Sequence, residues 1–107
     1  MRNNKEFAIH GIEVMEHGEA KVIGRCLIGP IFLGDMFDVI CSIAPSVDGL
    51  PGERRRISNA RLQIKKMTAY GVDLPRIDQN MTALLLVCAS EFKDVKVNLV
   101  LGKSLEV

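Results

Sequence analysis

The chain has 107 residues, of which 48% are hydrophobic and 25% are charged, as expected for one folded domain. Its 14 basic and 13 acidic residues leave a net charge of +1, which excludes attraction to nucleic acid or an anionic membrane through overall charge. The polar start of the chain, Met1–Glu6, lacks the apolar core of a signal peptide, and no apolar run approaches the ~20 residues that span a bilayer. We therefore expect a single cytoplasmic domain over residues 1–107 that makes no membrane contact.

The first half of the chain alternates short apolar runs with glycine breaks, a pattern typical of strands joined by tight turns. Gly11 lies inside the first run, where we expect a bulge or a sharp barrel corner. Gly18 is the predicted left-handed residue of a hairpin tip, and Gly34-Asp35 is a further turn. The predicted strands of this half are 7–14, 20–28, 31–33 and 36–43.

The fourth predicted strand, Met36–Ile43, shows the clearest alternation. The alternation predicts that Phe37, Val39, Cys41 and Ile43 share one face of the strand.

The next segment, Ala44–Glu53, is predicted to be an exposed loop because proline and glycine are frequent in it. This loop ends in Arg54-Arg55-Arg56, the only dense basic run of the chain. Residues 57–70 fit a helix and a strand equally well by periodicity. We predict a strand from about Asn59 to Ala69, because a lone helix would need a sheet face to cover.

The last third of the chain contains a predicted loop at Gly71–Gln79, a continuous apolar strand at Met81–Ala89 and a final strand at Val97–Leu101. Phe92–Val95 fits a single helical turn. The count of six or seven short strands without a secure long helix predicts an all-β fold. We expect a small β-barrel with its core at about residues 7–103, because closure hides the edges of many short strands.

The turn motifs resemble those of the second domain of the translational GTPases, the β-barrel that follows the GTP-binding domain in elongation factor Tu and its relatives. The motifs are Gly24-Arg25, then Gly29-Pro30-Ile31, then Gly34-Asp35 before an apolar strand. The resemblance extends over residues 7–103 and implies a barrel of the translation-factor domain 2 type.

The same resemblance limits the expected activity. The sequence contains no G-x-x-x-x-G-K-[ST] phosphate loop, so we expect no GTP binding. In the family, one strand of this domain contributes a Glu and an Arg to the aminoacyl end of tRNA. That strand is similar to Lys66-Met67-Thr68-Ala69 here, where both charged contacts are absent.

Candidate chemistry elsewhere in the chain is sparse. The three cysteines are odd in number and widely spaced, which predicts buried thiols rather than a disulfide framework. His10 and His17 are the only histidines and have no third ligand at a metal-binding spacing. No motif assembles a nucleophile with a base, so we expect no catalytic residues, no metal and no cofactor.

The expected function is therefore binding. Arg54, Arg55 and Arg56 are the predicted partner-binding residues, because guanidinium groups grip phosphates or carboxylates through forked hydrogen bonds. A protein partner is favoured over RNA, since the overall charge is balanced and no aromatic residue lies beside the arginines. RNA binding through the basic loop stays a possibility, and an immunity or antitoxin protein that neutralises a toxin is the alternative.

Overall fold

The structure is a computed structural model that describes residues 3–44 and 52–105, and in this part of the chain it contains no helix. The strands are β1 (Asn3–Val14), β2 (Glu19–Ile28), β3 (Ile31–Phe32), β4 (Met36–Ile43), β5 (Arg54–Ala69), β6 (Val72–Asp73), β7 (Arg76–Ile77), β8 (Thr82–Cys88) and β9 (Val100–Ser104).

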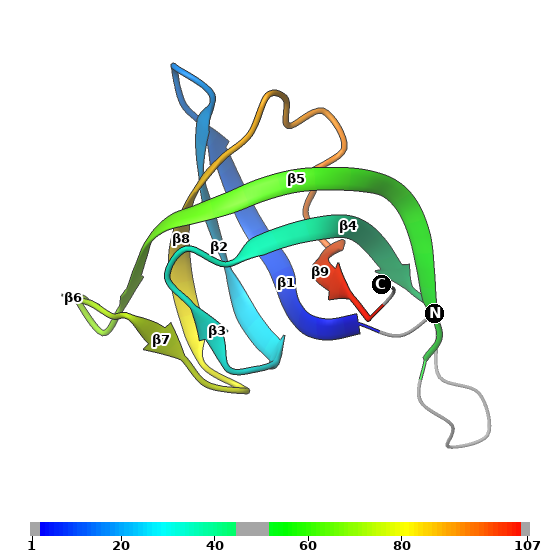
Figure 1. Cartoon of the computed structure of the whole chain (residues 1–107), viewed down its shortest axis with the longest axis horizontal. Coiled ribbons are helices and arrows are strands. Elements are labelled where there is room, and N and C mark those ends of the chain that lie inside the picture. Colours follow the sequence, from blue (N-terminus) through cyan, green and yellow to red (C-terminus); the bar gives the residue numbers. More distant parts are fainter. Residues whose placement is uncertain (1–2, 45–51, 106–107) are drawn as a thin grey trace.

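Six of these strands form a closed ring of antiparallel pairs. The order β4-β9-β1-β2-β8-β5 closes on itself because β4 also pairs with β5. β6 continues the sheet beyond β5, and β3 pairs with β7 in a separate two-stranded sheet. Figure 1 shows β5 as a long arc across the molecule, running over β1, β2 and β8 toward β6. The predicted all-β fold and the small barrel are confirmed.

The hairpin of β1 and β2 forms where the glycines predicted it. His17 and Gly18 adopt φ angles of 62° and 73°, so two left-handed residues make the tip. The register of the pair shifts between Ile9 and Gly11, which confirms the bulge at this glycine. Gly24 is required on β2, since a Cβ atom there would lie 1.8 Å from the carbonyl oxygen of Ala8.

The barrel interior is filled by apolar side chains from each strand of the ring. Phe7, Val22, Phe37, Leu62, Leu85 and Leu101 are all at most 1% exposed. Because inward residues alternate with outward ones along a strand, one continuous core forms inside the ring.

The predicted single apolar face of β4 is wrong. Phe37 and Ile40 pack into the main core, whereas Val39 and Cys41 belong to a second, smaller cluster. Ile43 is 42% exposed. The pairing of β4 with β5 shifts register twice along the strand, and the first shift, between Phe37 and Val39, is where the inward face changes.

The predicted start of the strand after the loop is wrong. β5 begins at Arg54 rather than Asn59, because its first three residues pair with the end of β4. The three arginines therefore lie in a strand and not in a loop. Residues 45–51 of the expected loop lie outside the described residues.

Three smaller differences lie nearer the C-terminus. The predicted loop Gly71–Gln79 contains the short strands β6 and β7. Phe92–Val95 forms a turn in which the Val95 N–H donates to the Phe92 carbonyl over 3.0 Å, and it does not form a helix. The last strand begins three residues later than predicted, at Val100.

Candidate functional site

Arg54, the first predicted binding residue, forms an ion pair with Glu6 inside the protein. Its Nε donates to both carboxylate oxygens of Glu6, over 3.0 and 2.8 Å, and its Nη2 donates to Glu6 Oε1 over 2.8 Å. The Glu6 side chain is 1% exposed and also accepts a 2.7 Å hydrogen bond from Asn3 Nδ2. These hydrogen bonds to Glu6 raise the pKa of the Arg54 guanidinium above its ordinary value. Arg54 therefore joins the start of β5 to β1 and is not available to a partner.

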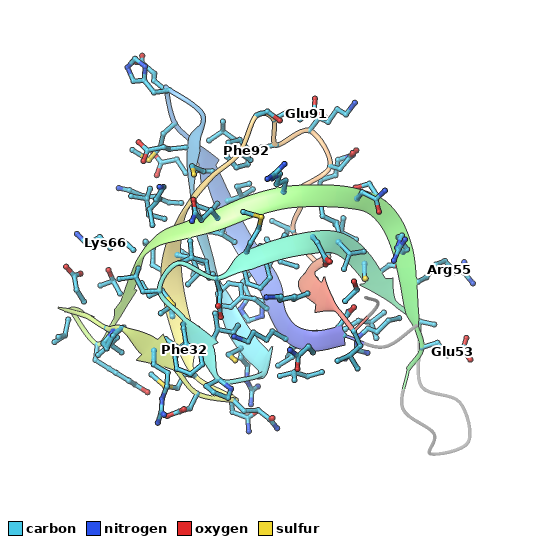
Figure 2. All side chains as sticks on the ribbon, in the orientation of Figure 1. Phe32, Glu53, Arg55, Lys66, Glu91 and Phe92 are labelled. Carbon is cyan, nitrogen blue, oxygen red and sulfur yellow. The ribbon has the colours of Figure 1, made fainter. Side chains whose placement is uncertain are left out.

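Arg55 and Arg56 are both exposed, and they pair across the ladder with Ser42 and Cys41 of β4. Successive side chains of a strand point to opposite faces. The structure therefore does not bring the three arginines together into one patch. In Figure 2 the side chain of Arg55 projects away from the barrel beside Glu53.

Positive charge is concentrated along the whole of β5. This strand carries six of the 14 Lys and Arg residues of the chain and none of its 13 Asp and Glu residues. The six are Arg54, Arg55, Arg56, Arg61, Lys65 and Lys66. Figure 2 shows Arg55 and Lys66 near opposite ends of the arc, both directed outward. The balanced total charge thus hides a basic strand on a barrel whose remainder is acidic.

A groove of about 240 Å³ lies beside the middle of this strand, between β5 and the segment that follows β8. We call it the β5 groove. Its floor is apolar and its rim is polar. The floor includes Ile40, Leu62 and Val95, and the rim consists of Asn59, Arg61, Ser90, Glu91, Lys93 and Asp94.

The β5 groove exists because β8 separates from β5. The two strands pair from Gln63 to Thr68 of β5, and Cys88, the last residue of β8, is opposite Gln63. Beyond this point residues 89–95 turn away from β5. Within the described residues, the part of β5 at positions 54–62 therefore pairs with β4 on one side and with no strand on the other.

The charges of the β5 groove are of both signs. Arg61 lies on the β5 wall, while Glu91 and Asp94 lie on the opposite wall with Lys93. Lys93 forms an exposed ion pair with Glu91 at 3.7 Å. The groove therefore offers both cations and carboxylates around an apolar floor, which suits a ligand with mixed chemistry.

The cysteines and histidines do not form a reactive centre in residues 3–44 and 52–105. Cys26, Cys41 and Cys88 are thiols without a disulfide there. Burial, reinforced by the negative charge of Asp78, raises the pKa of Cys26 to about 11. No three His, Cys, Asp or Glu side chains of this region lie close enough to hold a metal ion. No helix of this region is long and apolar enough to cross a membrane.

Sequence reasoning missed the β5 groove and its principal cation, Arg61. One signal was available, because residues 54–69 are free of acidic residues in a chain that is otherwise rich in them. The groove itself had no local signal, since residues 59–62 and 89–95 are distant in the sequence and meet only in the fold.

No family model matches the sequence, and no curated protein matches it significantly. The structure is similar to translation elongation factor SelB from Methanococcus maripaludis, solved in its apo form, with a TM-score of 0.68 and 10% sequence identity. The similarity covers 96% of this chain and 20% of the SelB chain. The chain therefore has a fold like that of a translation-factor domain.

Proposed function

We propose that this protein is a non-catalytic, cytoplasmic binding module that holds a macromolecular partner in the β5 groove. The observation that carries the proposal is the groove itself, an open depression of about 240 Å³ with an apolar floor and a charged rim. Binding sites typically combine an apolar surface with a few precisely positioned polar groups. The likeness of the barrel to part of a translation elongation factor supports a role in macromolecular contact.

The partner is a protein rather than RNA. A phosphate chain carries no apolar side chains for the floor that Ile40, Leu62 and Val95 form. β5 carries no aromatic residue on which bases would stack. A polypeptide supplies what the groove lacks, namely apolar side chains for its floor and groups of both charges for its rim.

Site-directed photo-crosslinking tests the proposal in cell extract. A benzophenone side chain is placed at Asn59 or Lys93, on the two walls of the groove, and at Lys21 on β2 as an exposed control. We expect the same discrete adduct from both groove positions and none from Lys21. The adduct should be lost on protease treatment and survive ribonuclease.

Two outcomes contradict the proposal. Adducts that are identical from Lys21 and from the groove positions would place binding elsewhere on the surface. An adduct that ribonuclease removes would identify RNA as the partner. The identity of the captured protein also separates a translation component from a toxin neutralised by an immunity protein.

A further inference from the structure

We propose that residues 54–62 of β5 are an open strand edge that receives an extended acidic segment of the partner protein as an added strand. This inference rests on the proposed function, because it specifies how the partner lies in the β5 groove. Three observations support it, and each concerns a different property of the strand: its backbone, the space beside it and its charge.

The backbone observation is that residues 54–62 of β5 are paired along one edge only, although the ring of strands closes. In the described part of the chain β5 pairs with β8 only from Gln63 to Thr68, so residues 54–62 have a strand neighbour on the β4 side alone. Backbone N–H and C=O groups are strong hydrogen-bonding groups, and an unpaired edge presents a row of them to any extended chain. Peptide recognition by strand addition uses such edges.

The space observation is that the β5 groove lies along this edge. It is lined by residues 59–62 of β5 on one side and by residues 89–91 and 93–95 on the other. The second wall contains the turn at Phe92–Val95, which is closed by a 3.0 Å backbone hydrogen bond. An added strand lies about 4.8 Å from its neighbour. The groove lies directly beside residues 59–62 of β5, which form part of its lining.

The charge observation is that the strand is basic along its exposed side chains. The side chains of Arg55 and Arg61 are exposed and have no hydrogen bond or ion pair to any residue that the structure describes. Side chains of an added strand lie beside those of its neighbour on the same face. Glutamates or aspartates at alternate positions of the partner segment would therefore meet these cations, and guanidinium–carboxylate contacts are among the strong polar ones.

A phosphate backbone fits this strand edge less well than a peptide does. It is an acceptor chain without N–H donors, so it leaves the carbonyl groups of the β5 edge unpaired. Exposed Ile57, with 50% of its surface accessible, also interrupts the basic side chains with an apolar one. An acidic peptide suits both the edge and Ile57. Its backbone donates and accepts hydrogen bonds, and apolar side chains can lie between its carboxylates.

The test uses the whole ¹⁵N-labelled chain and a blocked eight-residue peptide in which glutamate alternates with valine. We expect saturable binding with amide signal changes centred on residues 54–62. Arg61→Gln and Arg55→Gln should each weaken binding by about threefold to tenfold. Arg76→Gln, which removes the same charge from an exposed position on β7, should leave the affinity unchanged.

Three matched probes complete the experiment. The same peptide with N-methyl groups at alternate residues keeps its charge and loses its edge-facing donors, so we expect it not to bind. A version with lysine in place of glutamate should not bind either. Oligouridine of equal charge should bind more weakly than the acidic peptide and without changes confined to residues 54–62.

The inference is overturned if the N-methylated peptide binds as well as its parent, or if oligouridine binds more tightly at the same residues. It is also overturned if the acidic peptide leaves the signals of residues 54–62 unchanged. In that last case a persistent protein adduct from Asn59 and Lys93 would show that the proposed function stands and that only the strand-addition mode is wrong.

Discussion

At the residue scale, Arg54 and Arg55 are neighbours in the sequence with different surroundings. Arg54 reaches a carboxylate that is 1% exposed, whereas Arg55 projects into solvent. Removal of one partner of a buried ion pair leaves the other charge without compensation, which costs much more than the loss of a surface charge.

We therefore expect Arg54→Gln to lower the free energy of unfolding by about 3–5 kcal/mol, since the Glu6 carboxylate stays buried without its guanidinium. Arg55→Gln is the matched control and should change stability by no more than about 0.5 kcal/mol. Urea unfolding followed by circular dichroism measures both. Equal decreases in the free energy of unfolding for the two variants would show that the Arg54–Glu6 ion pair does not stabilise the fold more than a surface charge does.

Cys26 offers a second prediction at this scale, from a pKa that burial raises from 9.0 to about 11. A raised pKa of an acid means that the folded state favours the neutral thiol. The stability that the neutral Cys26 thiol contributes to the fold is fully present below about pH 9 and is lost as the pH rises toward 11.

Alkylation of Cys26 by iodoacetamide should therefore be slow at pH 8 and should increase up to about pH 11, as mass spectrometry of the labelled peptides measures it. The half-buried Cys88 should react faster at pH 8 and is the internal control. Asp78→Asn should lower the pKa of Cys26 slightly, because it removes the smaller of the two causes. Rapid labelling of Cys26 at pH 8 in the folded protein would contradict this account.

At the scale of elements, the β1–β2 hairpin depends on one close approach between its strands. A Cβ at Gly24 would lie 1.8 Å from the Ala8 carbonyl oxygen and 2.7 Å from Phe7 Cε1, whereas a Cβ at Gly11 would meet nothing within 4 Å. The two glycines thus lie in one hairpin and have opposite steric surroundings.

Gly24→Ala should destabilise the protein by about 1–3 kcal/mol or more, because the added methyl group forces the two strands apart. Gly11→Ala should be neutral or stabilising by up to about 1 kcal/mol, since it restricts the unfolded chain without a clash. Thermal unfolding of both variants measures the difference. A larger loss from Gly11→Ala than from Gly24→Ala would show that the bulge, and not the strand contact, limits this hairpin.

At the scale of the whole molecule, strands of the ring differ in whether they are paired on one side or on both. β2 pairs with β1 on one side and β8 on the other, so its amides are held in ladders on both sides. Residues 54–62 of β5 pair with β4 alone within the described chain. The ring should therefore exchange its amide hydrogens unevenly.

Hydrogen exchange followed by NMR should show fast exchange at alternate amides of residues 54–62, those that point away from β4. The amides of residues 20–24 on β2 should exchange about 1,000-fold more slowly or slower still, close to the limit set by global unfolding. Gln63–Thr68 of β5 is the control, because β8 pairs with this part of the same strand. Slow exchange at every amide of residues 54–62 would contradict an open edge.

The three consecutive arginines show how much of the site could be predicted from local sequence. The arginines themselves are evident in the sequence. That Arg54 is paired internally depends on Glu6, which is 48 residues away in the sequence. The alternation of β4 likewise predicted a strand correctly and its inward face wrongly, because the register shifts arise from its partner β5.

The sequence by itself determined the all-β class, the hairpin of β1 and β2, the bulge at Gly11 and the turn at Gly34, whose φ is 90°. These features are local, since glycine and short apolar runs decide them within a few residues. Only the tertiary structure decided that β4 closes the ring on β5, that Arg54 pairs with the buried Glu6, and that β5 has an open edge beside a groove. Each of these depends on contacts between distant segments, whose geometry no single stretch of the chain contains.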